Sequence, residues 1–128
     1  MVVVAALFGS GQAASADPVL RVSVTAARLA PGGLQVLLTG RYTCGPFSPG
    51  SDGVVDLTVT QDPGTTGFGY LFVTVCDGTA QVWSAPVDSI GGPFARGRAE
   101  LTGSGYACDR ATGVCAFTSF GPTLIRIR

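Results

Sequence analysis

The chain has 128 residues, enough for one domain of ordinary size, and its eight arginines balance eight acidic residues to a formal net charge of zero. It contains no histidine and no lysine, which removes the usual general base, the usual zinc ligand and the amine of Schiff-base chemistry. The balanced charge provides no long-range field that would attract nucleic acid or an anionic membrane. Hydrophobic residues make up 46% and charged residues 12%, with nineteen glycines and eight prolines, which is typical of short strands joined by tight turns.

The N-terminal segment has the features of a secretory signal. Residues 1–8 are apolar over a length too short to span a bilayer, and an Ala-Ser-Ala tripeptide ending at residue 16 supplies the small-x-small pattern that a signal peptidase cleaves. No basic residue precedes the apolar run, so we expect a signal whose start is truncated or misassigned. We predict a signal peptide over residues 1–16 and one secreted domain over residues 17–128. The alternative is a buried N-terminal strand.

Seven segments alternate apolar and polar residues at the period of two that is typical of half-buried strands. Segments rich in Gly, Pro, Asp and Ser, which favour turns, separate them. The predicted strands cover residues 20–25, 34–44, 54–60, 68–76, 80–87, 98–108 and 115–128. The side chains expected on the buried face include Leu34, Val36, Leu38, Tyr42, Cys44, Val55, Leu57, Val59, Tyr70 and Phe72.

The later strands contain interruptions. Pro86 and Pro122 cannot donate a ladder hydrogen bond, so each is expected to mark an edge, an exit or a division of its strand. The inward parity of the sixth strand changes between Leu101 and Tyr106, which predicts a bulge at residues 103–105. The last strand carries four apolar residues of one parity, Cys115, Phe117, Ile125 and Ile127. Without any helical periodicity, this pattern predicts an all-β fold, a seven-stranded antiparallel immunoglobulin-like sandwich with two disulfides.

Four cysteines allow three pairings, and export favours their oxidation. Cys108 and Cys115 flank a turn short enough to close a hairpin, which leaves Cys44 to pair with Cys76. The chain-entropy formula gives about 2.5 kcal/mol for the small loop and about 3.7 kcal/mol for the larger one. Pairing of Cys44 with Cys108 is an alternative, because a tyrosine two residues before Cys108 has the spacing of an immunoglobulin tyrosine corner. A four-cysteine zinc site is a further alternative, although no Cys-x-x-Cys pair exists.

No residue is predicted to be catalytic, and no metal or cofactor is expected. Asp56 and Glu100 fall within predicted strands, where nothing places them on facing surfaces as glycoside hydrolysis would require. Ser104 lies between two glycines but has no base to activate it. Five aspartates occur in turn sequences, where the side chain caps its own backbone: Asp52, Asp62, Asp77, Asp88 and Asp109. We therefore predict that the protein is not an enzyme.

Aromatic residues beside turns give the best signal for binding. Phe47 and Phe94 each follow a Gly-Pro pair, and Phe68 and Tyr70 open a predicted strand. Aromatic side chains held by rigid loops can form a recognition patch. The sequence predicts that these four residues contribute to a binding surface. The alternative is that the rings close the open ends of the sandwich.

Three short motifs between residues 39 and 94 are Thr-Gly-x-Tyr-Thr-Cys at 39–44, Cys-Asp-Gly-Thr at 76–79 and Gly-Pro-Phe at 92–94. Together with the signal they resemble a family of small exported proteins of high-GC Gram-positive bacteria whose function is not known. This resemblance implies the compartment and the β-sandwich fold, and it carries over no site.

The close late pair Cys108 and Cys115 is similar to the plan of the neocarzinostatin apoproteins, exported sandwiches of similar length that have two disulfides and bind a chromophore in a cleft. The chain departs from that plan because it lacks their Gly-Leu-x-Asp-Gly opening and separates Cys44 widely from Cys76. The resemblance implies a small-molecule carrier.

These observations predict a secreted bacterial protein that acts without catalysis, as a monomer, and binds a protein or a component of the cell envelope. Two alternatives remain open. One is a small-molecule carrier, which needs an apolar cleft. The other is a secreted enzyme inhibitor that uses the loop over residues 109–114, since a disulfide preorganises it for binding. No nucleic-acid partner and no transmembrane segment in the mature chain are expected.

Overall fold

The computed structural model describes residues 17–128, so the predicted signal peptide lies outside the described residues. Each predicted segment corresponds to one strand, although the first, third and fifth extend further than expected and the fourth begins and ends earlier. The strands are β2 (Val19–Leu29), β3 (Gln35–Gly45), β4 (Asp52–Gln61), β5 (Thr65–Val73), β6 (Ala80–Ile90), β7 (Gly97–Cys108) and β8 (Cys115–Ile127). Within this part of the chain, no helix is long and apolar enough to cross a membrane.

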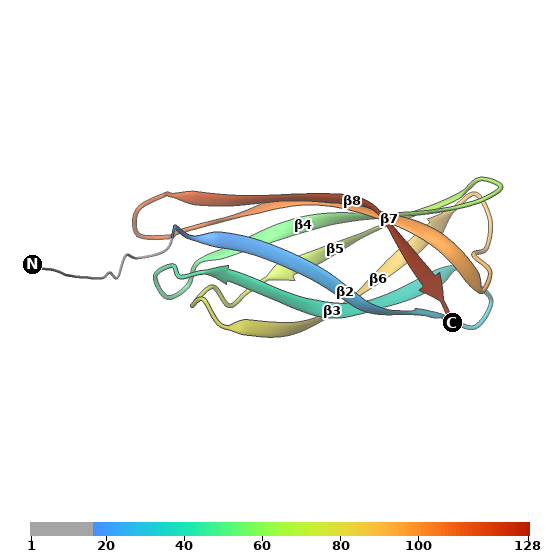
Figure 1. The fold of residues 1–128 in the computed structure, drawn as a ribbon, viewed down its shortest axis with the longest axis horizontal. Coiled ribbons are helices and arrows are strands. Elements are labelled where there is room, and N and C mark those ends of the chain that lie inside the picture. The colour runs from blue at the N-terminus through green and yellow to red at the C-terminus, as the bar shows by residue number, and fades with distance from the viewer. Residues whose placement is uncertain (1–16) are drawn as a thin grey trace, which may run out of the picture.

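The seven strands form a closed barrel in the order β2-β3-β6-β5-β4-β7-β8 (Figure 1). Six neighbouring pairs are antiparallel, whereas β2 and β8 are parallel and close the barrel. At the closure the Leu29 amide donates to the Arg128 carbonyl over 2.9 Å, and the Arg128 amide donates to the Ala27 carbonyl over 3.0 Å. The all-β prediction is confirmed. The predicted purely antiparallel sandwich is wrong, because the parallel β2–β8 pair closes the strands into a barrel. Hydrogen bonding continues around the barrel because β4 pairs with β5 along its length and β2 meets β8.

The core fills the inside of the barrel, where alternate residues of each strand point inward. Most of the side chains expected there from the sequence are buried, including those of the central strand β3 and of β4. The largest fully buried side chains are Leu38, Leu57, Leu101, Ile127, Val36, Val55, Val59, Val73 and Val87. Leu34 is an exception because it precedes β3 and is exposed.

The sequence predicts the wrong face of β5 to be buried. Tyr70 and Phe72 point outward, while the inward positions include Gly67 and Gly69. A Cβ atom on Gly67 would lie 2.8 Å from the ring of Phe94, and one on Gly69 would meet the carbonyl oxygen of the β6 proline. Only glycine therefore fits inside at these two positions, and the aromatic residues must face outward. Cys76 still turns inward because β5 ends before it and an irregular segment resets the alternation.

The predicted bulge lies in β8 rather than in β7. Inward alternation along β7 is unbroken, and the register with β8 shifts between Leu101 and Gly103, where β8 accommodates an additional residue beside Pro122. Because of this shift, Phe117 is exposed while Ile127 is buried, although their sequence spacing gives them the same parity.

Pro86 marks a local edge within β6 rather than its end. The strand continues to Ile90, and Pro86 pairs with Leu37 of β3. On its other side the pairing of β6 with β5 ends at Gly69 and Val87, next to the proline. Because proline has no amide hydrogen, it is well suited to the point at which a ladder stops.

Both disulfides favoured by the cysteine spacing are present. Cys44 of β3 is joined to Cys76 in the segment after β5, and Cys108 is joined to Cys115 across the β7–β8 turn. None of the cysteines is free, so neither the Cys44–Cys108 pairing nor a four-cysteine zinc site is formed.

Candidate binding site

The four aromatic residues singled out from the sequence separate into two pairs. Phe47 and Phe94 are only 9% and 3% exposed, whereas Phe68 and Tyr70 are 47% and 55% exposed. The two buried rings belong to loops at opposite ends of the barrel. The Phe47 amide donates to the Cys76 carbonyl and the Phe94 amide donates to the Gly33 carbonyl, each over 2.7 Å. These two side chains close the ends of the core, which leaves Phe68 and Tyr70 at the surface.

β5 presents three aromatic side chains in succession on its outer face. Phe72, which the sequence predicts to be buried, is 68% exposed and continues the line of Phe68 and Tyr70. The ring centroids of Tyr70 and Phe72 are 6.3 Å apart and tilted by 31°. We call these three residues the β5 aromatic triplet. The signal that could have identified it is the pair of glycines at positions 67 and 69, which leaves the inner face at the start of β5 without large side chains.

A row of side chains extends this surface across three further strands. Phe72 is directly opposite Val54 of β4, Val54 is opposite Tyr106 of β7, and Tyr106 is opposite Phe117 of β8. Phe117 is 75% exposed and Tyr106 is also exposed. Since an aromatic side chain has roughly 200 Å² of surface, the triplet, Tyr106 and Phe117 together expose on the order of 600 Å². That is the upper end for the largest apolar patch on a typical monomer, about 300–600 Å², and such patches commonly mark interaction sites.

A cleft of about 430 Å³ lies between β5 and β6, beside the triplet. It begins where the β5–β6 pairing stops, and its lining reaches Thr74 and Val75 in the segment that joins the two strands. Tyr42 and Trp83, both buried, and Leu71 contribute to its lining. The Trp83 indole Nε1 donates to two backbone carbonyls, which fixes the ring in place. The lining contains one carboxylate, Asp88, and no arginine.

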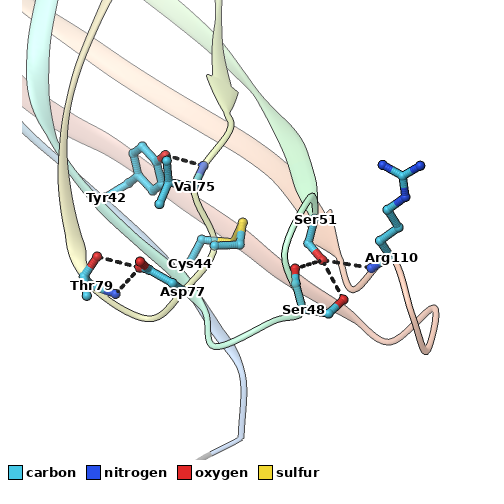
Figure 2. Close-up of a disulfide and its surroundings, with 9 residues drawn as sticks. Tyr42, Cys44, Ser48, Ser51, Val75, Asp77, Thr79 and Arg110 are labelled. Carbon is cyan, nitrogen blue, oxygen red and sulfur yellow. Dashed lines mark hydrogen bonds between the residues drawn. A yellow bond between two sulfur atoms is a disulfide. The ribbon is translucent and has the colours of Figure 1, made fainter.

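The segment over residues 74–79, of which Thr74 and Val75 line the cleft, is held by several bonds (Figure 2). The Val75 amide donates to the hydroxyl of Tyr42 over 3.1 Å, and Cys76 is bonded to Cys44. The carboxylate of Asp77 accepts hydrogen bonds from the side chain and the backbone amide of Thr79, which lower the pKa of Asp77. These bonds hold the edge of the cleft at Thr74 and Val75 in place without a ligand, which reduces the entropic cost of binding.

The exposed β7–β8 turn is tied to the loop between β3 and β4. The Ser48 hydroxyl donates to the carboxylate of Asp109, and this is the main reason why the pKa of Asp109 is lowered. The Arg110 amide donates to the hydroxyl of Ser51 over 2.9 Å (Figure 2). Within the turn, the Asp109 amide donates to the Val114 carbonyl over 2.7 Å. The turn is compact and projects into solvent.

The carboxylates are distributed around the barrel. In residues 17–128, no group of three or more His, Cys, Asp or Glu side chains is arranged to hold a metal ion. Asp56 and Glu100 lie on exposed positions of β4 and β7. In the β4–β7 ladder Asp56 is opposite Ser104 and Glu100 is opposite Thr60, so the two carboxylates do not face each other. Asp77 and Asp109 have lowered pKa values through turn hydrogen bonds, the structural role that the sequence predicts for them.

Comparison with known proteins identifies no family. No protein-family model matches the chain, and no curated protein sequence matches it. Among solved structures the chain is similar to AggA, the major subunit of aggregative adherence fimbriae type I from Escherichia coli, at 10% identity. The similarity covers 91% of this chain and 98% of that chain with a TM-score of 0.42, which is too low to assign a fold family or a function.

Proposed function

We propose that the protein is a secreted, non-catalytic immunoglobulin-like domain that binds a protein or a cell-envelope component through the β5 aromatic triplet and the adjoining cleft. The observation that carries this proposal is the line of Phe68, Tyr70 and Phe72 on one exposed strand face beside an ordered apolar cleft. Aromatic side chains dominate the binding energy of interfaces because they bury a large area at a low entropic cost. The two disulfides support an oxidising compartment.

The strand order supports the immunoglobulin-like assignment. The run β2-β3-β6-β5 corresponds to the A-B-E-D sheet of that fold, and the run β4-β7-β8 corresponds to its C-F-G sheet. In this interpretation the β4–β5 pairing and the parallel β2–β8 contact join the two sheets at their edges.

The proposal is tested by affinity capture from culture supernatant and cell-wall fractions with the domain over residues 17–128. Tyr70→Ser and Phe72→Ser remove exposed rings, so we expect both variants to fold and to lose captured partners by more than tenfold. Leu124→Ser is the matched control, because Leu124 is similarly exposed but lies on β8 away from the triplet. Equal capture by all four proteins would contradict the proposal.

A small-molecule carrier is the second candidate, because the cleft has the volume and the aromatic lining that such a ligand needs. A larger hollow of about 610 Å³ is less suitable, since its lining includes Arg96, Arg98 and Glu100 and no aromatic residue. A carrier would show saturable binding of an apolar fluorophore that quenches Trp83, whereas an interaction module would not.

An enzyme inhibitor is supported by the compact, exposed turn over residues 109–114. In that case Arg110→Ala would abolish the activity and Phe72→Ser would leave it unchanged. The opposite pattern is expected if the β5 aromatic triplet is the binding site.

A further inference from the structure

The seam between β5 and β6 contains unpaired strand edges. The two strands pair only from Thr66–Ile90 to Gly69–Val87. Beyond this point residues 70–73 pair only with β4, and residues 80–85 pair only with β3. Figure 1 shows the beginning of β6 diverging from β5. Each strand thus presents backbone amide and carbonyl groups to the cleft, and such edges are templates for another strand.

The orientation of β6 can be read from Pro86. A Cβ atom on Gly69 would meet the carbonyl oxygen of Pro86, so the backbone of Pro86 faces β5. Hydrogen-bonding direction alternates along a strand, which means that the amides and carbonyls of Val82 and Ser84 also point into the seam. Pro86 further shows that a proline of this parity is compatible with the β3–β6 ladder.

The side chains around the seam match the alternation of an added strand. Trp83 and Leu71 are buried on the core side, while Val82, Tyr70 and Phe72 are exposed on the outer side. A strand placed between β5 and β6 would direct alternate residues to these two environments. In strand addition the main chain supplies affinity, and pockets for alternate side chains supply specificity.

The charge of the cleft restricts the occupant further. Asp88 lies at the closed end, where the β5–β6 pairing begins, and the lining has no arginine to neutralise it. The Asp88 carboxylate accepts a hydrogen bond from the Gln35 side chain over 2.9 Å, which fixes its position. An uncharged apolar segment that ends in a basic residue complements this arrangement.

We propose that the seam binds an extended peptide segment of another protein by strand addition to β6, with apolar residues at alternate positions and a lysine or arginine beside Asp88. This inference rests on the proposed function and narrows the partner to a peptide. The hydrogen bonds involve the backbone of Val82 and Ser84, and the β5 aromatic triplet covers the outer side chains.

The probe is a random twelve-residue peptide library displayed on phage, selected on the oxidised domain over residues 17–128. The expected result is enrichment of peptides with alternating apolar residues and a basic end. The synthetic consensus peptide should protect the amides of Val82 and Ser84 from hydrogen exchange. Val82→Pro, which copies the tolerated Pro86, should weaken binding about tenfold through the lost amide hydrogen. Val82→Thr, which keeps that amide, should bind within about twofold.

Asp88→Asn tests the charge of this residue separately, because asparagine can still accept the hydrogen bond from Gln35. The substitution should weaken binding of the consensus peptide. It should have no effect on binding of a peptide whose basic residue is replaced by alanine. The proposal would be overturned if the library yields no enriched peptide, or if the consensus peptide protects only amides other than those of Val82 and Ser84 from hydrogen exchange. It would also be overturned if Val82→Pro binds the consensus peptide as tightly as the wild type. Self-association that Val82→Pro abolishes would also overturn it, since the occupant would then be a second copy. If Phe72→Ser loses the natural partner while Val82→Pro retains it, the proposed function stands and strand addition fails.

Discussion

The two disulfides should contribute unequally to stability. The Cys44–Cys76 bond spans a sequence separation of 32 residues and the Cys108–Cys115 bond spans 7. On the chain-entropy model these correspond to about 3.7 and about 2.5 kcal/mol of constraint on the unfolded chain. Cys44 and Cys76 are also buried, whereas the other pair is only half-buried. Replacing Cys44 and Cys76 by alanine therefore leaves unfilled volume in the core, which lowers the free energy of unfolding by roughly a further 1 kcal/mol.

The comparison is between the double variants Cys44→Ala with Cys76→Ala and Cys108→Ala with Cys115→Ala. We expect the first to lose about 4–5 kcal/mol and the second about 2.5 kcal/mol of the free energy of unfolding, a difference of about 2 kcal/mol. Equilibrium urea denaturation of both variants beside the wild type measures this difference. Equal losses within about 0.5 kcal/mol, or a larger loss from the small loop, would refute the argument from loop length and burial.

Three further predictions concern individual polar contacts. Trp83→Phe removes the indole N–H that donates to the carbonyls of Ser23 and Arg41. The free energy of unfolding should therefore fall by about 1–3 kcal/mol in urea denaturation. An unchanged midpoint would show that water replaces the donor. Gln61→Leu leaves the backbone partners of a buried amide unpaired and should cost about 2 kcal/mol or more in the same assay; a neutral effect would contradict the assigned bonds. The hydrogen bond from Ser48 lowers the pKa of Asp109 below its usual value of 3.8, so its stabilising effect is present above that value and is lost as pH falls through the lower pKa of the folded state. The stability difference between wild type and Asp109→Asn should thus be largest near neutral pH and vanish in strong acid, and a constant difference would exclude this linkage.

The sequence indicated the number of strands and favoured the disulfide pairing that the structure shows. Both follow from local information: alternation at period two between turn residues identifies each strand, and a close cysteine pair across a turn leaves the remaining two to each other. The alternation also identified the buried faces of β3 and β4, where apolar residues occupy most of the alternate positions and Gly40 is the exception in the middle of β3. No distant part of the chain is needed for these assignments.

The candidate site depended on contacts between distant segments. Phe72 is outside because the ring of Phe94 and the backbone of Pro86 occupy the space beside Gly67 and Gly69, and neither neighbour is near in sequence. Phe47 and Phe94 are inside because their Gly-Pro loops fold back over the ends of the barrel, an outcome that the sequence offered only as an alternative.

Sequence by itself therefore determined that this chain makes seven strands, and it favoured the two disulfides, because periodicity and turn chemistry act over a few residues. Only the tertiary structure decided that the strands close into a barrel, that the β5–β6 ladder stops at Pro86, and that an aromatic surface and a cleft lie beside the unpaired edges. The physical reason is that strand register and side-chain parity are set by which distant backbones approach one another, and a shift of one residue exchanges the inner and outer faces.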